Sequence, residues 1–64
     1  MYMAEIRDRD IYSFIKEGGG RATRRRIFEA LGDDEESRKT IEEKLMMMAR
    51  MGIVIIEGDE VRIR

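Results

Sequence analysis

Four arginines stand close together in the first half of the chain, at positions 21, 24, 25 and 26. A guanidinium group pairs well with phosphate oxygens, and a helix N-terminus already favours anions. Arg24, Arg25 and Arg26 would occupy the first turn of a helix, where cations oppose the helix dipole, so local stability does not explain them. Arg21 and these three are either phosphate contacts or a solvated surface paired with the acidic residues 33–36.

Residues 18–20 are three glycines followed by Arg21, a pattern superficially similar to a phosphate-binding loop. Such a loop follows a strand and ends in lysine and serine or threonine, and neither feature is found here. The chain also has no histidine and no cysteine. The usual general base near neutral pH, thiol chemistry and most zinc sites are therefore missing. We expect no catalytic residues, no metal and no cofactor, and an enzyme is the least favoured class of function.

Charge is distributed unevenly along a nearly neutral chain. The 13 basic and 14 acidic residues give a net charge of −1. Residues 21–32 contain four basic residues and one acidic residue, whereas residues 33–44 contain three basic and six acidic residues. Charged residues make up 42% of the chain, and asparagine, glutamine, proline and tryptophan are absent. This composition resembles that of thermophile proteins.

Three consecutive methionines occupy positions 46–48. On a helical wheel Met48 points toward the apolar stripe, and Met46 and Met47 flank the outward face. Methionine is frequent at partner surfaces, and the apolar surface exceeds what so short a chain can bury. We therefore expect a homodimer, although the first helix and the N-terminal residues could instead cover this surface within one chain. The expected dimer contacts are Tyr2, Met3, Met46, Met47, Met51, Ile53 and Ile55.

Residues 40–64 predict a helix that ends at a glycine and leads into a β-hairpin. Ile41, Leu45 and Met48 share one face of a helix, and Gly52 favours its end because glycine takes the left-handed conformation at little cost. The β-branched run 53–56 prefers an extended chain. A two-residue turn of Gly58 and Asp59 would place residues 56 and 54 opposite residues 61 and 63. One face of this hairpin would then be aliphatic.

Two shorter helices are predicted upstream. The first would have Asp8 or Asp10 as its N-cap, extend for about two turns and stop at the glycines. The second would be capped by Thr23 and closed by Gly32 in the same way that Gly52 closes the third. The third would have Asp34 or Ser37 as its cap. The predicted core is Ile11, Phe14, Ile15, Ile27, Phe28, Leu31, Ile41, Leu45, Met48, Val54, Ile56, Val61 and Ile63.

Taken in order, residues 8–64 resemble the winged helix-turn-helix family. The residues that carry the resemblance are Thr40-Ile41, Leu45, Met48 and Met51-Gly52-Ile53-Val54, supported by Arg9-Asp10-Ile11 and Ala30-Leu31-Gly32. The resemblance implies one α+β domain over residues 1–64, with three helices followed by a C-terminal hairpin wing at 53–64 and an apolar arm at 1–7. Residues 33–38 form a longer turn than the family's tight link.

The resemblance implies that the chain binds double-stranded DNA and regulates transcription by occupancy, without a small-molecule effector. The third helix would enter the major groove, with the wing along the backbone or minor groove. The positive charge of residues 21–32 predicts that the second helix makes the main phosphate contacts. The expected DNA contacts are Arg21, Arg24, Arg25, Arg26, Lys39, Glu42, Glu43, Met46, Arg50, Arg62 and Arg64.

Acidic residues before the third helix and at the wing tip oppose this function, because carboxylates repel phosphates. The alternative is a winged-helix module that binds protein and no nucleic acid, since one fold hosts both functions. The chain has no apolar run of the roughly 20 residues that cross a bilayer, and its N-terminus lacks the features of a signal peptide. We expect a cytoplasmic protein with no membrane partner.

Overall fold

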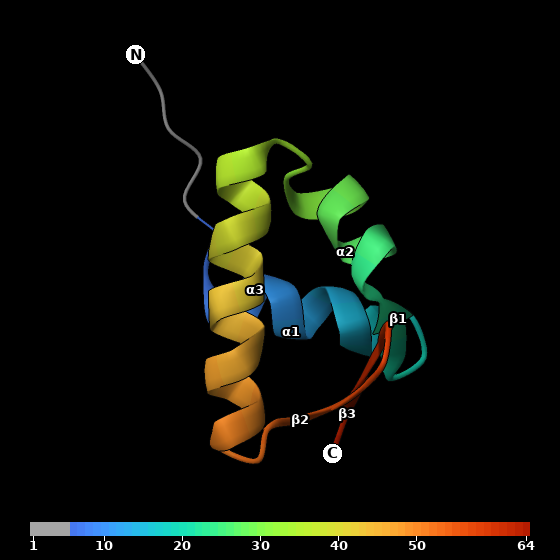
Figure 1. Ribbon diagram of the computed structural model, residues 1–64. Coiled ribbons are helices and arrows are strands. Elements are labelled where there is room, and N and C mark those ends of the chain that lie inside the picture. Colours follow the sequence, from blue (N-terminus) through green and yellow to red (C-terminus); the bar gives the residue numbers. More distant parts are fainter. Residues whose placement is uncertain (1–5) are drawn as a thin grey trace.

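The computed structural model describes residues 6–64 and has the α+β layout expected of a winged helix (Figure 1). The helices are α1 (Asp8–Glu17), α2 (Arg24–Leu31) and α3 (Glu35–Arg50). A short strand, β1 (Arg21–Thr23), lies between α1 and α2, and the hairpin strands are β2 (Val54–Glu57) and β3 (Glu60–Ile63). In Figure 1, α1 crosses behind α3, α2 lies to one side, and the hairpin extends from the end of α3.

The hairpin has the predicted register and gains a third strand that the sequence patterns did not predict. Val54 is paired with Ile63 and Ile56 with Val61. Gly58 has a φ of +60° and no non-glycine residue of the described chain has a positive φ, which matches a type II′ turn with glycine first. Strand β1 then pairs with β3, which gives an antiparallel sheet of order β1-β3-β2.

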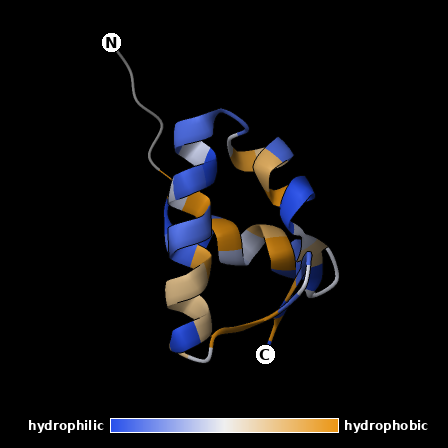
Figure 2. Ribbon diagram, in the orientation of Figure 1, coloured by the Kyte–Doolittle hydropathy of each residue, from blue (hydrophilic) through white to orange (hydrophobic). Residues whose placement is uncertain are grey.

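The core lies where the three helices meet the inner face of the sheet. Its buried side chains were all predicted: Ile11, Ile15, Ile27, Ile41, Leu45, Met48, Val54 and Val61. The other predicted members, Phe14, Phe28, Leu31, Ile56 and Ile63, are partly buried and pack against them. Figure 2 shows apolar and polar residues mixed along α1 and α2 and a first half of α3 that is mainly hydrophilic.

Hydrogen bonds at the helix starts confirm two of the predicted caps and correct the third. The Thr23 hydroxyl accepts from the Arg26 N–H at 3.2 Å, and the Asp34 carboxylate accepts from the Ser37 N–H at 3.1 Å. For α1 the prediction of Asp8 or Asp10 as N-cap is wrong. Arg7 holds the cap position, and its backbone N–H donates to the Asp10 carboxylate at 3.0 Å. A carboxylate one turn inside the helix therefore satisfies the cap residue's own N–H.

The helix ends differ more from one another than their glycines suggested. After α3, Gly52 has a φ of +77°, and the Ile53 N–H donates to the Met48 carbonyl at 2.9 Å, which is a Schellman ending. Gly32 after α2 has a φ of 162°, outside the left-handed region, so its predicted likeness to Gly52 is wrong. A Cβ at Gly32 would lie 2.5 Å from the Ser37 Cβ, so close packing with α3 requires glycine here.

The link between α2 and α3 is shorter than predicted. It comprises residues 32–34, because the acidic residues from Glu35 onward already belong to α3. The expected long turn over residues 33–38 is therefore wrong. The Asp34 cap starts α3 early by accepting from both the Ser37 N–H and, at 2.7 Å, the Ser37 hydroxyl. The resulting three-residue link is typical of tight helix-turn-helix units.

Candidate nucleic-acid interface

Arg24 is committed to contacts within the protein. Its backbone N–H donates to the Asp59 carbonyl at 2.9 Å, which joins the start of α2 to the hairpin turn. Its Nη1 atom donates to both carboxylate oxygens of Glu42 on α3, at 2.8 and 3.0 Å. The Arg24 side chain is 29% exposed, and its Nε is buried with no hydrogen-bond partner in the described structure. Two expected DNA contacts, Arg24 and Glu42, thus neutralise each other and join α2 to α3.

Arg25 and Arg26 are the exposed cations at the start of α2. Neither forms an ion pair with a carboxylate of residues 6–64. They lie on different sides of the helix. Arg25 lines a groove toward α3, and Arg26 lines a pocket toward α1 and β1. Their charges face the helix dipole without local compensation, so an external anion would stabilise this turn.

The groove beside Arg25 is not an anion site by itself. It has a volume of about 420 Å³, and three arginines and four carboxylates line it. Arg38 donates to Asp33 at 3.0 Å and lies over the Phe28 ring at 5.3 Å, so its charge is already paired. Since Glu42 and Asp33 each hold an arginine, Arg25 is the cation of this groove that can approach a phosphate.

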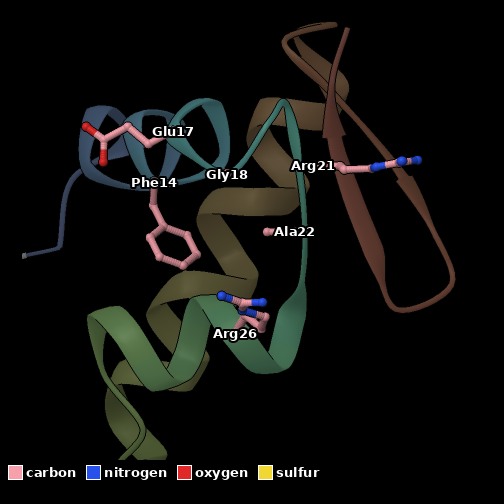
Figure 3. Close-up of a pocket in the computed structure, with 6 residues that line it drawn as sticks. All are labelled: Phe14, Glu17, Gly18, Arg21, Ala22 and Arg26. Carbon is pink, nitrogen blue, oxygen red and sulfur yellow. The ribbon is translucent and has the colours of Figure 1, made fainter.

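The pocket beside Arg26 is smaller, at about 260 Å³. In Figure 3 the Phe14 ring and the Arg26 side chain extend toward the same space, whereas the Arg21 side chain extends away from it, across the hairpin. Arg21 is exposed, with its Nε 4.0 Å from a Glu60 carboxylate oxygen. A contact of that length in solvent holds the side chain weakly. Arg21 therefore remains able to reach a ligand outside the pocket.

The outward face of α3 carries the remaining expected contacts. Lys39, Glu43 and Arg50 are exposed and form no ion pair with described residues, and the Met46 side chain is 61% exposed. Glu42 is held by Arg24, so it is not available to read a base. Lys44, which was not among the expected contacts, lies 3.3 Å from Asp8 and joins α3 to α1.

The wing offers less positive charge than its two arginines suggest. Arg62 donates to Glu57 across the hairpin at 3.2 Å. Arg64 is exposed, and no carboxylate of residues 6–64 pairs with it. Asp59 at the turn is exposed and also unpaired within the described chain. Arg64 is therefore the free cation of the wing, at its C-terminal end and away from its acidic tip.

The expected dimer contacts separate into three groups. Met46, Met47 and Met51 are 61%, 53% and 59% exposed, so neither α1 nor any other described residue covers them. Ile53 is half-buried and packs against the core, and Ile55 is half-buried opposite Arg62 in the sheet. Tyr2 and Met3 lie outside the described residues. Among residues 6–64, the exposed large apolar side chains are Met46 and Met47 of α3 and Met51 just after it.

Searches of protein-family models, curated proteins and solved structures gave no match to this chain. We therefore infer its function from its own residues. Within residues 6–64, no helix is long and apolar enough to span a membrane, and no three acidic side chains are gathered to hold a metal ion. The sequence patterns missed the pairing of Glu42 with Arg24, because the two residues are 18 positions apart and no local spacing rule relates them.

Proposed function

We propose that this chain is a winged helix-turn-helix protein that binds double-stranded DNA and regulates transcription by occupying its site. The observation that carries this proposal is the pair of exposed arginines at the start of α2, Arg25 and Arg26, which form no ion pair with any residue of 6–64. Uncompensated cations at a helix N-terminus cost stability, and a phosphate would remove that cost. Sequence-independent phosphate contacts of this kind supply much of the affinity for DNA.

The layout of the helices supports the same function. Helices α2 and α3 are joined by three residues, and the hairpin is anchored to the start of α2 through Arg24 and Asp59. In helix-turn-helix docking the helix before the recognition helix crosses the DNA backbone. That geometry would bring Arg25 and Arg26 to the phosphates when the outward face of α3, with Lys39 and Glu43, faces the bases.

The contacts divide into positioning and binding roles. Arg24 and Glu42 would hold α2 against α3 and would not touch DNA. Arg25 and Arg26 would bind phosphates, with further cationic contacts from Arg21, Lys39, Arg50 and Arg64, the other exposed basic residues on the expected surface. Arg62 is held by Glu57 and would contribute less. The acidic side chains of α3 limit the affinity, because each unpaired carboxylate repels the backbone.

Duplex binding measured across a series of salt concentrations tests the proposal. Arg25→Ala with Arg26→Ala should weaken binding to all duplexes and reduce the slope of log affinity against log salt by about two units, roughly one per lost phosphate contact. Preference among sequences should remain. Arg24→Ala should leave the slope nearly unchanged, since that arginine is held by Glu42.

A matched charge control is Arg9→Ala with Lys16→Ala, which removes two exposed cations from α1. This variant should keep the wild-type slope. Absence of salt-dependent binding by the wild type at low ionic strength would refute the proposal. An equal loss of slope in the α1 variant would show that only net charge matters.

A protein-binding module is the second candidate, and the exposed methionines of α3 favour it. Met46 lies on the face that would enter the groove and Met47 and Met51 are also exposed, yet methionine offers no charge and no strong hydrogen bond to DNA. An apolar helical face of this type fits a protein partner. If the wild-type chain is folded but binds no duplex, protein binding remains as the candidate function.

A further inference from the structure

The outward face of α3 contains an apolar patch between two opposite charges. Glu43, Met46, Met47 and Arg50 line a shallow depression of about 380 Å³. The two methionine side chains are more than half exposed, at 61% and 53%. Neither Glu43 nor Arg50 has an ion partner in the described part of the chain. Among residues 6–64, the two charged side chains thus have no ion partner and the two methionines remain largely uncovered.

The spacing of these four residues is symmetric about one point of the helix. Glu43 and Arg50 are seven residues apart, which places them about 10.5 Å apart along the axis and nearly on one line. Their midpoint falls between Met46 and Met47, which lie on either side of that line. Rotation by half a turn about this point exchanges the acidic end of the patch with the basic end and returns the methionines to the centre.

We propose that this patch binds the same patch of a second copy, with the two α3 helices antiparallel across a two-fold axis. In that arrangement Glu43 of each copy faces Arg50 of the other, and four methionine side chains meet at the centre. An isologous interface requires this property, namely that a residue and its counterpart exchange roles between the copies. Met51, at 59% exposed, would extend the apolar contact at both ends.

Charge complementarity favours a second copy of the chain as the partner and favours the antiparallel orientation of the two helices. A parallel pairing would place Glu43 against Glu43 and Arg50 against Arg50, so both ends would repel. Antiparallel pairing gives an attractive contact at each end of the patch. Methionine side chains suit the centre because they pack adaptably against one another. A domain of this size also gains stability from oligomerisation, which adds buried apolar surface to a small core.

Sedimentation equilibrium of the full chain without DNA tests the proposal by charge exchange. Glu43→Arg alone and Arg50→Glu alone each replace two attractive contacts per dimer with two repulsive ones, and each should raise the dimer dissociation constant by about tenfold or more. The combined variant Glu43→Arg/Arg50→Glu restores opposite charges across the axis. It should return the dissociation constant to within about threefold of wild type.

Two further variants complete the experiment. Glu29→Arg on α2 changes charge as Glu43→Arg does but lies outside the patch, and it should leave dimerisation unchanged. Met46→Glu should abolish the dimer, and far-UV circular dichroism should show that every variant keeps its helices. A chain that is monomeric from micromolar to millimolar concentration would overturn the proposal. A dimer that survives both single exchanges, or that the combined variant fails to restore, would also overturn it.

Discussion

At the scale of single residues, the start of α3 depends on one carboxylate. Asp34 accepts from the N–H and the hydroxyl of Ser37, and these hydrogen bonds lower the pKa of Asp34 below its ordinary value of 3.8. A lowered pKa in the folded state means that the unfolded chain binds the proton more readily. The stabilisation from this cap is therefore complete at pH values above 3.8, and it is lost as pH falls through the lower pKa of the folded state.

Asp34→Ala should reduce the stability of the protein near neutral pH, and the difference from wild type should shrink at pH values below 3.8. Urea unfolding of both proteins across pH measures this difference. Ser37→Ala provides the test of cause, because it removes the hydroxyl that contributes most to the lowered pKa. An NMR titration should then show the Asp34 pKa closer to 3.8, and an unchanged titration would contradict the assignment.

Gly52 ends α3 with its backbone in the left-handed region. Its φ of +77° is strained for any residue with a Cβ, although the atom nearest to an added Cβ is the end of the flexible Arg64 side chain at 3.3 Å. Gly52→Ala should therefore lower the free energy of unfolding by about 1–2 kcal/mol through backbone strain. Gly18→Ala is the matched control.

Gly18 has a φ of −89°, and an added Cβ there would meet only ordinary contacts at 3.4–3.6 Å. Its substitution should change the free energy of unfolding by less than about 1 kcal/mol, because the folded backbone already suits alanine. Thermal or urea unfolding of the two variants gives the comparison. Equal destabilisation by both would mean that the ending of α3 is not held by its left-handed glycine.

Between elements, Arg24 of α2 and Glu42 of α3 form an ion pair that joins the two helices. Both side chains are about one-third exposed, at 29% and 37%, so solvent weakens their attraction. A double-mutant cycle with Arg24→Ala, Glu42→Ala and the double variant should give a coupling of about 0.5–1 kcal/mol in urea unfolding. The coupling should decrease in high salt. A coupling near zero would mean that this ion pair does not set the angle between the helices.

The sequence was sufficient to predict the elements whose signals are local. The stripe of Ile41, Leu45 and Met48 predicted α3, and the run 53–56 with Gly58 predicted the hairpin and its register. Strand β1 is three residues long, too short for an alternating pattern, and it exists because β3 provides a partner nearly 40 positions away. Tertiary pairing of this kind leaves no periodic signal.

The difference between local signals and tertiary contacts also explains which parts of the candidate site could be predicted. The helical wheel placed Met46 and Met47 on either side of the outward face, and in the structure both are more than half exposed. The pairing of Arg24 with Glu42 depends on how α2 crosses α3, and side-chain packing across the interface determines that crossing. Charge counting along the chain therefore overestimated the free positive charge of the second helix by one arginine.

In the whole molecule, DNA binding and the proposed dimer would both use the outward face of α3. The face that would enter the major groove includes Glu43, Met46 and Arg50, and the proposed dimer buries these residues. A chain cannot place this face in DNA and against a second copy at once. Dimer formation would therefore compete with DNA binding, and each equilibrium would shift the other by mass action.

The competition predicts that a duplex with a single binding site dissociates the dimer. Sedimentation of labelled duplex with wild-type protein should give complexes with one protomer per site, and the dimer should decline as duplex is added. The apparent affinity per protomer should weaken as total protein rises above the dimer dissociation constant, since only monomer binds. Arg9→Ala with Lys16→Ala should behave as the wild type does, because these exposed residues lie on α1, outside both the expected DNA contacts and the dimer patch. The contradicting result would be complexes that contain two protomers and still depend on the contact between residues 43 and 50. In that case the face of α3 in the groove would differ from the face at the dimer contact.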